Sequence, residues 1–257
     1  MSLWIGTSGW QYRHWRDRFY PRGLATSAWL DTYVEHFDTV ELNVTFYRQP
    51  RPAVFEAWAR RVPARFRFAV KASRYLTHVR RLLRPADAVA YLLDGARRLG
   101  SHLGPVLIQL PPDLATDPGA LAETLDAFPP EVPVTVEPRH DSWFHDEVRA
   151  VLADRSAALC WADRRGPLTP TWRTADWGYL RFHEGRAAPP PCYIEADLDD
   201  WARRAAATWG RDADVYAYFN NDPAGCALRD ATAFASAATA IGLCPTRVPA
   251  PGSVRVG

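Results

Sequence analysis

The sequence predicts a single-domain α/β fold, a closed (β/α)8 barrel of the TIM type. Short β-rich apolar runs alternate with helical patterns, and there are eight such runs. Several runs place apolar side chains on one face and mixed side chains on the other. A length of 257 residues suits one barrel, and an apolar fraction of 47% is enough for a large core.

The expected strands lie at residues 3–6, 39–43, 66–71, 104–110, 133–138, 157–162, 178–183 and 214–220. The expected helices lie near 26–36, 52–60, 86–100, 118–127, 144–154, 196–209 and 226–241. Pro52, Pro85 and Pro118 stand at or near helix starts, where a missing N–H costs nothing. Gly100 and Gly242 follow helical stretches, as C-terminal caps do.

Two connections break the alternation. Residues 163–177 show little helical periodicity, and residues 184–193 contain three consecutive prolines, so both are expected to be irregular. The sequence shows no repeat and no internal linker. We therefore expect one domain over residues 1–244, followed by a Pro/Gly-rich tail at 245–257 on the surface.

Strand parity favours a closed barrel over an open sheet. In the run 66–71, Phe66, Phe68 and Val70 oppose Arg67, Ala69 and Lys71. A parallel sheet covered by helices on both faces would read as nearly continuous apolar runs. The same alternation recurs in 39–43, 104–110, 133–139 and 178–183. One face of each strand is therefore expected to meet helices and the other the barrel interior.

Composition narrows the function classes. A net charge of +2 gives no general electrostatic case for nucleic acid, so any attraction to anions must be local. The four cysteines show no CxxC pair or zinc-like spacing, and Cys160 is expected in the core. Met1 is followed almost at once by the first strand, and no apolar run approaches a membrane span. We expect a cytoplasmic protein without a membrane partner.

Polar side chains come late in seven of the eight expected strands. Barrel enzymes build their active sites at the carboxyl ends of the strands. Buried charges are costly unless paired, so this set predicts either a ligand site or a self-satisfied ring of ion pairs. The set comprises Glu41, Asn43, Lys71, Gln109, Glu137, Arg139, Asp163, Arg181, His183 and Asn220.

Lys71 is the only lysine among 31 basic residues. A position that keeps lysine in an arginine-rich chain could need a compact charge that neutralises a substrate carboxylate or phosphate. It could also need an amine that forms a Schiff base. The charge role is favoured, because nothing in the sequence shows that the amine is desolvated. The alternative is that an arginine-rich composition left one lysine by chance.

The remaining candidates suggest acid/base chemistry on an anion. Glu41 and Glu137 could form an acid/base pair, unless each only pairs with an arginine. Arg139 and Arg181 suit bidentate oxyanion binding or structural salt bridges, and His183 could shuttle protons. Further residues that could bind substrate come directly after strands, namely His78, His140, Trp10, Tyr12, Tyr47 and Trp143. The alternative is that these side chains are exposed in loops or packed in the core. The small-residue turn Gly6-Thr-Ser-Gly9 could also let backbone N–H groups approach a ligand.

No cofactor is predicted, although a divalent metal is an open alternative. Oxygen and imidazole ligands could come from Glu41, Glu137, Asp163 and His183. Cations at the same strand ends would repel a metal, and no HxH or HxxE pattern occurs at adjacent inward positions. A site with a bound metal is therefore less favoured than a site without one.

Several motifs resemble the YecE-like proteins, also termed domain of unknown function 72. They are Gly6-Thr-Ser-Gly-Trp10, Phe19-Tyr-Pro21, Thr39-Val-Glu-Leu-Asn-Val-Thr-Phe-Tyr47, Thr77-His78, Val106-Leu-Ile-Gln-Leu-Pro-Pro112, Val136-Glu-Pro-Arg139 and Tyr218-Phe-Asn-Asn221, in order from about residue 3 to about 241. The resemblance implies a TIM-type barrel but supplies no activity. Its barrel is similar to those of the xylose isomerase and endonuclease IV group, which implies a sugar-phosphate or nucleic-acid ligand by analogy. Strand seven departs from the family pattern, because Glu184 follows His183 where glycine is more usual.

Three functions follow as hypotheses. The leading one is an enzyme that binds a small anionic, sugar-like substrate at the mouth of the barrel and uses carboxylates for acid/base catalysis. The second is a nucleic-acid-binding or nuclease-like protein, in which aromatic side chains stack a base. The third is a non-catalytic metabolite binder.

Overall fold

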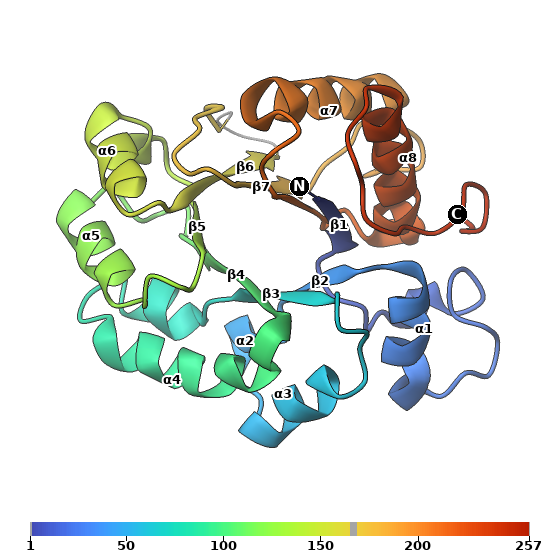
Figure 1. The fold of residues 1–257 in the computed structure, drawn as a ribbon, viewed down its shortest axis with the longest axis horizontal. Coiled ribbons are helices and arrows are strands. Elements are labelled where there is room, and N and C mark those ends of the chain that lie inside the picture. Colours follow the sequence, from blue (N-terminus) through green and yellow to red (C-terminus); the bar gives the residue numbers. More distant parts are fainter. Residues whose placement is uncertain (1, 165–168, 257) are drawn as a thin grey trace. The chain divides into compact units, whose positions relative to one another are not determined.

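The computed structural model describes residues 2–164 and 169–256, in which eight strands alternate with helices (Figure 1). The strands are β1 (Leu3–Thr7), β2 (Thr39–Leu42), β3 (Arg67–Lys71), β4 (Leu103–Gln109), β5 (Val134–Glu137), β6 (Ala158–Asp163), β7 (Gly178–Phe182) and β8 (Val215–Phe219). The α-helices are α1 (Trp29–His36), α2 (Val44–Tyr47), α3 (Pro52–Ala59), α4 (Ala86–Ala96), α5 (Pro118–Asp126), α6 (Asp146–Asp154), α7 (Glu195–Trp209) and α8 (Cys226–Ala240). Every strand boundary lies within one residue of its predicted position.

The strand order is β1-β8-β7-β6-β5-β4-β3-β2, so successive strands of the sequence are neighbours in the sheet. This order, with helices in most of the connections, confirms the predicted (β/α)8 fold class. By its contacts the chain forms two compact units, which we describe separately. Unit 1 comprises Met1–Glu41, Ala162–Arg165 and Leu180–Gly257, and unit 2 comprises Leu42–Trp161 and Gly166–Tyr179. The predicted domain boundary at residue 244 stays a prediction.

Unit 1 is built on the parallel pair β1 and β8, whose register runs from Leu3 opposite Val215 to Thr7 opposite Phe219. Helix α8 packs against both strands, and α7 lies beside it (Figure 1). Phe182 and Phe219 stack with ring centroids 4.5 Å apart, and Phe234 of α8 packs against both rings. Apolar burial of this kind fixes the helix pair on the strands.

Tyr33 of α1 fixes the end of β1 against β2 within unit 1. Its hydroxyl accepts from the backbone N–H of Thr7 and donates to the backbone oxygen of Thr39, each over 3.1 Å. A side chain at Gly6 would collide with that same backbone oxygen of Thr39. Glycine is therefore required where these two strands approach, before the chain turns at Gly9 with a φ of 101°.

Unit 2 contains the parallel run β3-β4-β5 and the first part of β6, in which Lys71 lies opposite Leu107 and Gln109 opposite Glu137. Pro52 and Pro118 lie in the first turns of α3 and α5, as predicted. The side chain of Asp117 caps α5 by accepting from the backbone N–H of Ala120 over 2.9 Å. Figure 1 shows α4, α5 and α6 following one another along these strands.

The structure differs from the predicted elements mainly at short turns that follow strands. Helix α2 and the turns η1 (Arg13–Trp15), η3 (Tyr75–Val79) and η5 (Asp141–Trp143) are too short to show a period in the sequence. The predicted helix at 86–100 ends at Ala96 and continues as the 3-10 turn η4 (Arg97–His102), because Gly100 leaves helical geometry with a φ of 59°. The predicted helix at 144–154 begins only at Asp146.

The two irregular connections behave as predicted where the structure describes them. The described part of 163–177 forms no helix beyond the end of β6, and residues 165–168 lie outside the described residues. The proline-rich connection 184–193 is tied to α8 by a disulfide between Cys192 and Cys226, whose Cα atoms are 4.8 Å apart. The sequence analysis assigned no partner to these two cysteines. Cys160 is buried, which confirms its predicted place in the core.

The Pro/Gly-rich tail follows the surface of unit 1 closely. Pro245 bridges to Leu3, and the hydroxyl of Thr246 accepts from the backbone N–H of Ile5 over 3.1 Å. The backbone N–H of Arg247 donates to Asp38 over 3.0 Å. Within the described ranges, every helix is too short or too polar to cross a bilayer.

Candidate functional site

Glu41 and Arg181 form the centre of a polar cluster in unit 1. Glu41 is fully buried at the end of β2, and its Oε1 accepts from Arg181 Nη2 and from Ser8 Oγ, each over 2.8 Å. Arg181 is only 1% exposed on β7. Two buried charges are tolerable because they neutralise each other. For Arg181 this geometry favours the salt-bridge alternative over substrate binding.

His183 extends this cluster towards β8. Its Nε2 lies 3.4 Å from Arg181 Nη1, and its Nδ1 lies 3.0 Å from the side-chain nitrogen of Asn220. The imidazole is half-buried. Arg181 therefore contacts both His183 and Glu41.

Asp163 lies beside His183, whose backbone N–H donates to the Asp163 backbone oxygen over 2.9 Å. Burial raises the pKa of the Asp163 carboxyl above its ordinary value, although hydrogen bonds from Tyr193 and Trp201 oppose the rise. The charge of the nearby His183 also opposes the rise.

Unit 1 also contains a histidine–carboxylate pair that the sequence analysis missed. His14 Nε2 lies 2.6 Å from Asp222 Oδ2, and the indole N–H of Trp15 donates to Asp222 Oδ1 over 2.6 Å. Burial raises the pKa of Asp222, while the nearby imidazole opposes the rise. If Nε2 carries the proton given to the carboxylate, Nδ1 is left as a base. Asp222 directly follows the motif ending in Asn221, and that adjacency was the available signal.

Glu137 is the centre of a second cluster, in unit 2. It is fully buried, its Oε1 accepts from Arg139 Nε over 3.1 Å, and its Oε2 accepts from Gln109 Nε2 over 3.0 Å. The Arg139 side chain keeps 30% of its surface exposed, unlike Arg181. Arg139 can therefore bind Glu137 and still offer its outer nitrogens to a ligand.

Lys71 lies under an aromatic ring in the same unit. Its side chain is 8% exposed, and its Nζ lies 4.3 Å from the ring centroid of Phe46. An ammonium over a ring face is stabilised as a cation. The backbone oxygen of Lys71 accepts from the Thr45 hydroxyl over 2.7 Å, which fixes the strand end below α2.

His78 lies close enough to Lys71 and Arg139 for both charges to affect its pKa. Its Nδ1 lies 2.8 Å from the Thr77 hydroxyl, and its ring packs edge-on against Phe46 at 5.1 Å. Burial lowers the pKa of His78 below its ordinary value, and the charges of Lys71 and Arg139 lower it further. Both effects favour the neutral form of the imidazole.

The aromatic candidates divide by exposure. Trp10 and Trp143 are buried, and the Trp143 indole donates to the Leu114 backbone oxygen over 2.7 Å, which favours packing over stacking. Tyr12 is half-buried and donates to the Ser8 backbone oxygen, whereas Tyr47 is 76% exposed.

The structure thus gathers most of the predicted residues into two clusters, one in each unit. That both clusters belong to one mouth stays a prediction. Of the remaining candidates, Asn43 directly precedes α2, and His140 Nδ1 accepts from the Ser142 backbone N–H over 3.2 Å, a local cap of η5. Over residues 2–164 and 169–256, His, Cys, Asp and Glu form no group of three that could hold a metal ion.

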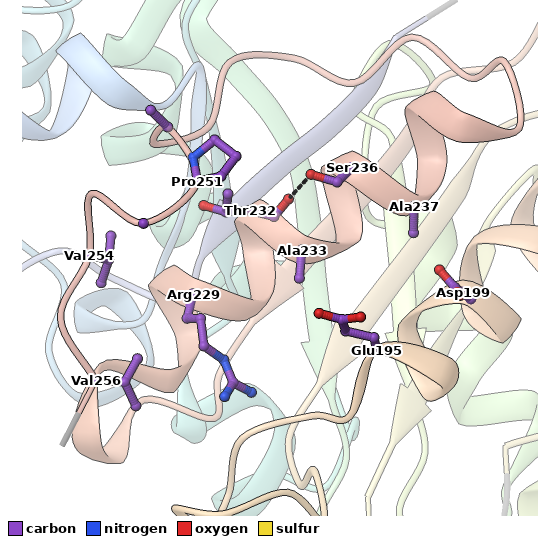
Figure 2. A pocket seen from close by; sticks show the side chains of 12 residues that line it. Glu195, Asp199, Arg229, Thr232, Ala233, Ser236, Ala237, Pro251, Val254 and Val256 are labelled. Carbon is purple, nitrogen blue, oxygen red and sulfur yellow. Dashed lines mark hydrogen bonds between the residues drawn. The ribbon is translucent and has the colours of Figure 1, made fainter.

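A separate cavity of about 580 Å³ lies in unit 1, between α7, α8 and the tail (Figure 2). Glu195 and Asp199 line it from α7, and Arg229 lines it from α8. Pro251 and Val254 close it from the tail. None of the predicted site residues lines this cavity, so it is no part of either cluster.

The comparisons with known proteins identify the family. Residues 4–251 match the family described as Protein of unknown function DUF72. The chain is a member of the DUF72 family. This confirms the resemblance to the YecE-like proteins.

Two similar sequences extend the family assignment. The chain is 25% identical over 256 residues to UPF0759 protein YunF of Bacillus subtilis, covering 87% of this chain and 90% of that protein. It is 32% identical over 143 residues to UPF0759 protein YecE of Escherichia coli K12, covering 55% of this chain and 50% of that protein. The names of these DUF72 relatives state no activity.

Solved structures agree on the fold. A DUF72 family protein from Thermotoga maritima matches with a TM-score of 0.80 and 26% identity, over 92% of this chain and 98% of that one. A DUF72 family protein from Enterococcus faecalis matches with a TM-score of 0.77 and 18% identity, over 92% and 95% of the two chains, which supports the fold alone.

Proposed function

We propose that this DUF72 protein is an enzyme that binds a small anionic, sugar-like substrate, either phosphorylated or carboxylated, and uses a buried carboxylate for acid/base catalysis. The observation that supports this most is the cluster in unit 2. There, fully buried Glu137 is bound by partly exposed Arg139, and the pKa of nearby His78 is lowered by burial and then by positive charges that include Lys71 and Arg139.

The anion would be held by Arg139 and Lys71. Arg139 uses Nε for Glu137, and within the described residues its two outer nitrogens make no hydrogen bond. A planar pair of N–H donors suits two oxygens of a carboxylate or phosphate. Lys71 adds a compact charge, and the Phe46 ring limits its access to water.

Proton transfer would fall to Glu137 and His78. Glu137 would act as the base, with its carboxylate held in a fixed orientation by the hydrogen bonds that its two oxygens accept from Gln109 and Arg139. The lowered pKa of His78 favours its neutral form, and among the described residues its Nε2 has no hydrogen-bond partner. A neutral imidazole beside a bound anion can accept or return a proton. In unit 1, Glu41 and His183 stay candidates for the same work.

The test is a turnover screen with phosphorylated and carboxylated sugars and sugar acids. Glu137→Gln keeps the shape of the side chain and removes the base, so it should abolish turnover while the substrate still binds. Glu123→Gln on the exposed face of α5 is the matched control and should act as the unmodified protein. Binding without turnover in the unmodified protein would contradict an enzyme and favour the metabolite-binder alternative.

A further inference from the structure

The charge of the chain is concentrated in one segment. Residues 44–91 contain 11 arginine and lysine residues against two acidic residues, a net charge of +9. The whole chain has a net charge of only +2, so the remaining residues together carry −7. A charge asymmetry of this size between parts of one chain favours a polyanionic partner for the basic part.

The same segment exposes most of the large apolar side chains. Seven large apolar residues are exposed in the part of the chain that the structure describes, and six of them fall between residues 44 and 91. Exposed apolar side chains that gather beside charged ones mark an interaction site, and three of these six line one cavity. The six are Val44, Tyr47, Tyr75, Val79, Leu83 and Tyr91.

Three of these side chains are tyrosines that line one cavity of about 360 Å³ in unit 2. Tyr47 comes from the end of α2, Tyr75 from the start of η3, and Tyr91 from α4. They are 76%, 47% and 64% exposed. Three ring faces at one hollow give a platform on which a flat ring can stack.

Two arginines line the same cavity without a partner of their own. The guanidinium groups of Arg48 and Arg74 make no hydrogen bond or ion pair to any residue of the described ranges. By contrast, Arg80 is committed, because its guanidinium lies 5.3 Å from the Tyr75 ring and its Nε donates to the Tyr75 hydroxyl over 2.8 Å. That contact fixes the orientation of one ring and leaves Arg48 and Arg74 available for an anion.

We propose that this tyrosine-lined cavity binds single-stranded nucleic acid, with a base stacked among Tyr47, Tyr75 and Tyr91 and the flanking phosphates on Arg48 and Arg74. Stacking on tyrosine accepts any base, and a basic surface follows the backbone. A duplex would present its bases only by their edges. A lipid surface would be met by a convex apolar face rather than by a hollow.

This site uses other binding residues than the proposed function, although Phe46 lines the cavity and the charge of Arg74 also lowers the pKa of His78. It uses neither Glu137 nor Arg139, and it requires a polymer rather than a small anion. The two proposals can therefore succeed or fail separately.

The experiment is fluorescence anisotropy of a labelled oligothymidylate of about 12 nucleotides, a length that spans one binding surface of this kind. Tyr47→Ala and Tyr91→Ala should each weaken binding by about 5-fold to 100-fold. Tyr47→Phe and Tyr91→Phe retain the ring face and should bind as the unmodified protein does.

The arginines are tested by salt. Affinity should fall steeply between about 50 and 200 mM salt, and Arg48→Gln and Arg74→Gln should each reduce the slope of log affinity against log salt by about one. Arg203→Gln on the exposed face of α7 is the matched control and should leave the slope unchanged. No binding at low salt, binding that the alanine variants do not weaken, or binding only to anionic lipid vesicles would overturn the proposal.

Discussion

Glu41 and Arg181 form an ion pair of 2.8 Å in which neither side chain is more than 1% exposed. Removing one partner strands the other charge in the core, at a cost of about 3–5 kcal/mol. We therefore predict that Arg181→Met lowers the free energy of unfolding by about that amount, measured by urea denaturation.

The control for this prediction is an exposed pair of the same kind. Arg204 and Asp200 lie 2.6 Å apart on α7, where both are about half exposed. Arg204→Met should change stability by less than about 1 kcal/mol. Equal losses in the free energy of unfolding at the two sites would show that burial of the Glu41–Arg181 pair does not determine its contribution to stability.

Lys71→Met should raise the pKa of His78. The charge of Lys71 lowers that pKa, and methionine keeps the contact with the Phe46 ring while removing the charge. The pKa is read by NMR titration of the His78 ring protons. Lys71→Arg retains the charge but not the compact ammonium, so it should keep the pKa of His78 low and weaken substrate binding. Unchanged turnover and affinity in Lys71→Arg would refute the special role of the lysine.

Stability should depend on pH through His78. Its folded pKa is lowered from an ordinary value of 6.5, so the unfolded chain binds a proton more readily. The stabilising contribution is therefore present above pH 6.5 and is lost as the pH falls through the folded pKa. His78→Gln should flatten this part of the pH–stability curve, as measured by thermal unfolding at several pH values. A curve that stays as steep in the variant would argue against a lowered pKa.

The disulfide between Cys192 and Cys226 closes a loop with a sequence separation of 34. Loop-closure entropy predicts a contribution of about 4 kcal/mol to stability. Cys192→Ala should therefore reduce the urea midpoint clearly, while Cys244→Ala, at an exposed free cysteine, should not. If both variants have the same urea midpoint as the unmodified protein, the disulfide contributes no stability.

The sequence was sufficient for the strands because period-two alternation and late polar residues are local signals. It placed Gln109 and Glu137 at strand ends, and parallel pairing made them register neighbours. It could not show that the side chain of Arg181 would be buried in an ion pair with Glu41 while that of Arg139 stays partly exposed. That difference depends on burial in the folded protein. The pair of His14 and Asp222 joins residues 208 positions apart, so no local pattern revealed it.

The cavity beside Tyr47 could not be predicted from the sequence either. Its position after a strand predicted a ligand contact, but the cavity depends on Tyr75 and Tyr91 as well, and the turn that holds Tyr75 has no periodicity to read. The cysteines show the same limit, since connectivity cannot be deduced from spacing alone.

The most direct test of anion binding in unit 2 is an NMR titration of His78 in the presence and absence of inorganic phosphate. A dianion held by Lys71 and Arg139 would offset the charges that depress the pKa of His78, so saturating phosphate should raise that pKa towards 6.5. The rise should disappear in Arg139→Met. A His78 pKa that stays the same with phosphate and without it would contradict an anion site at this cluster.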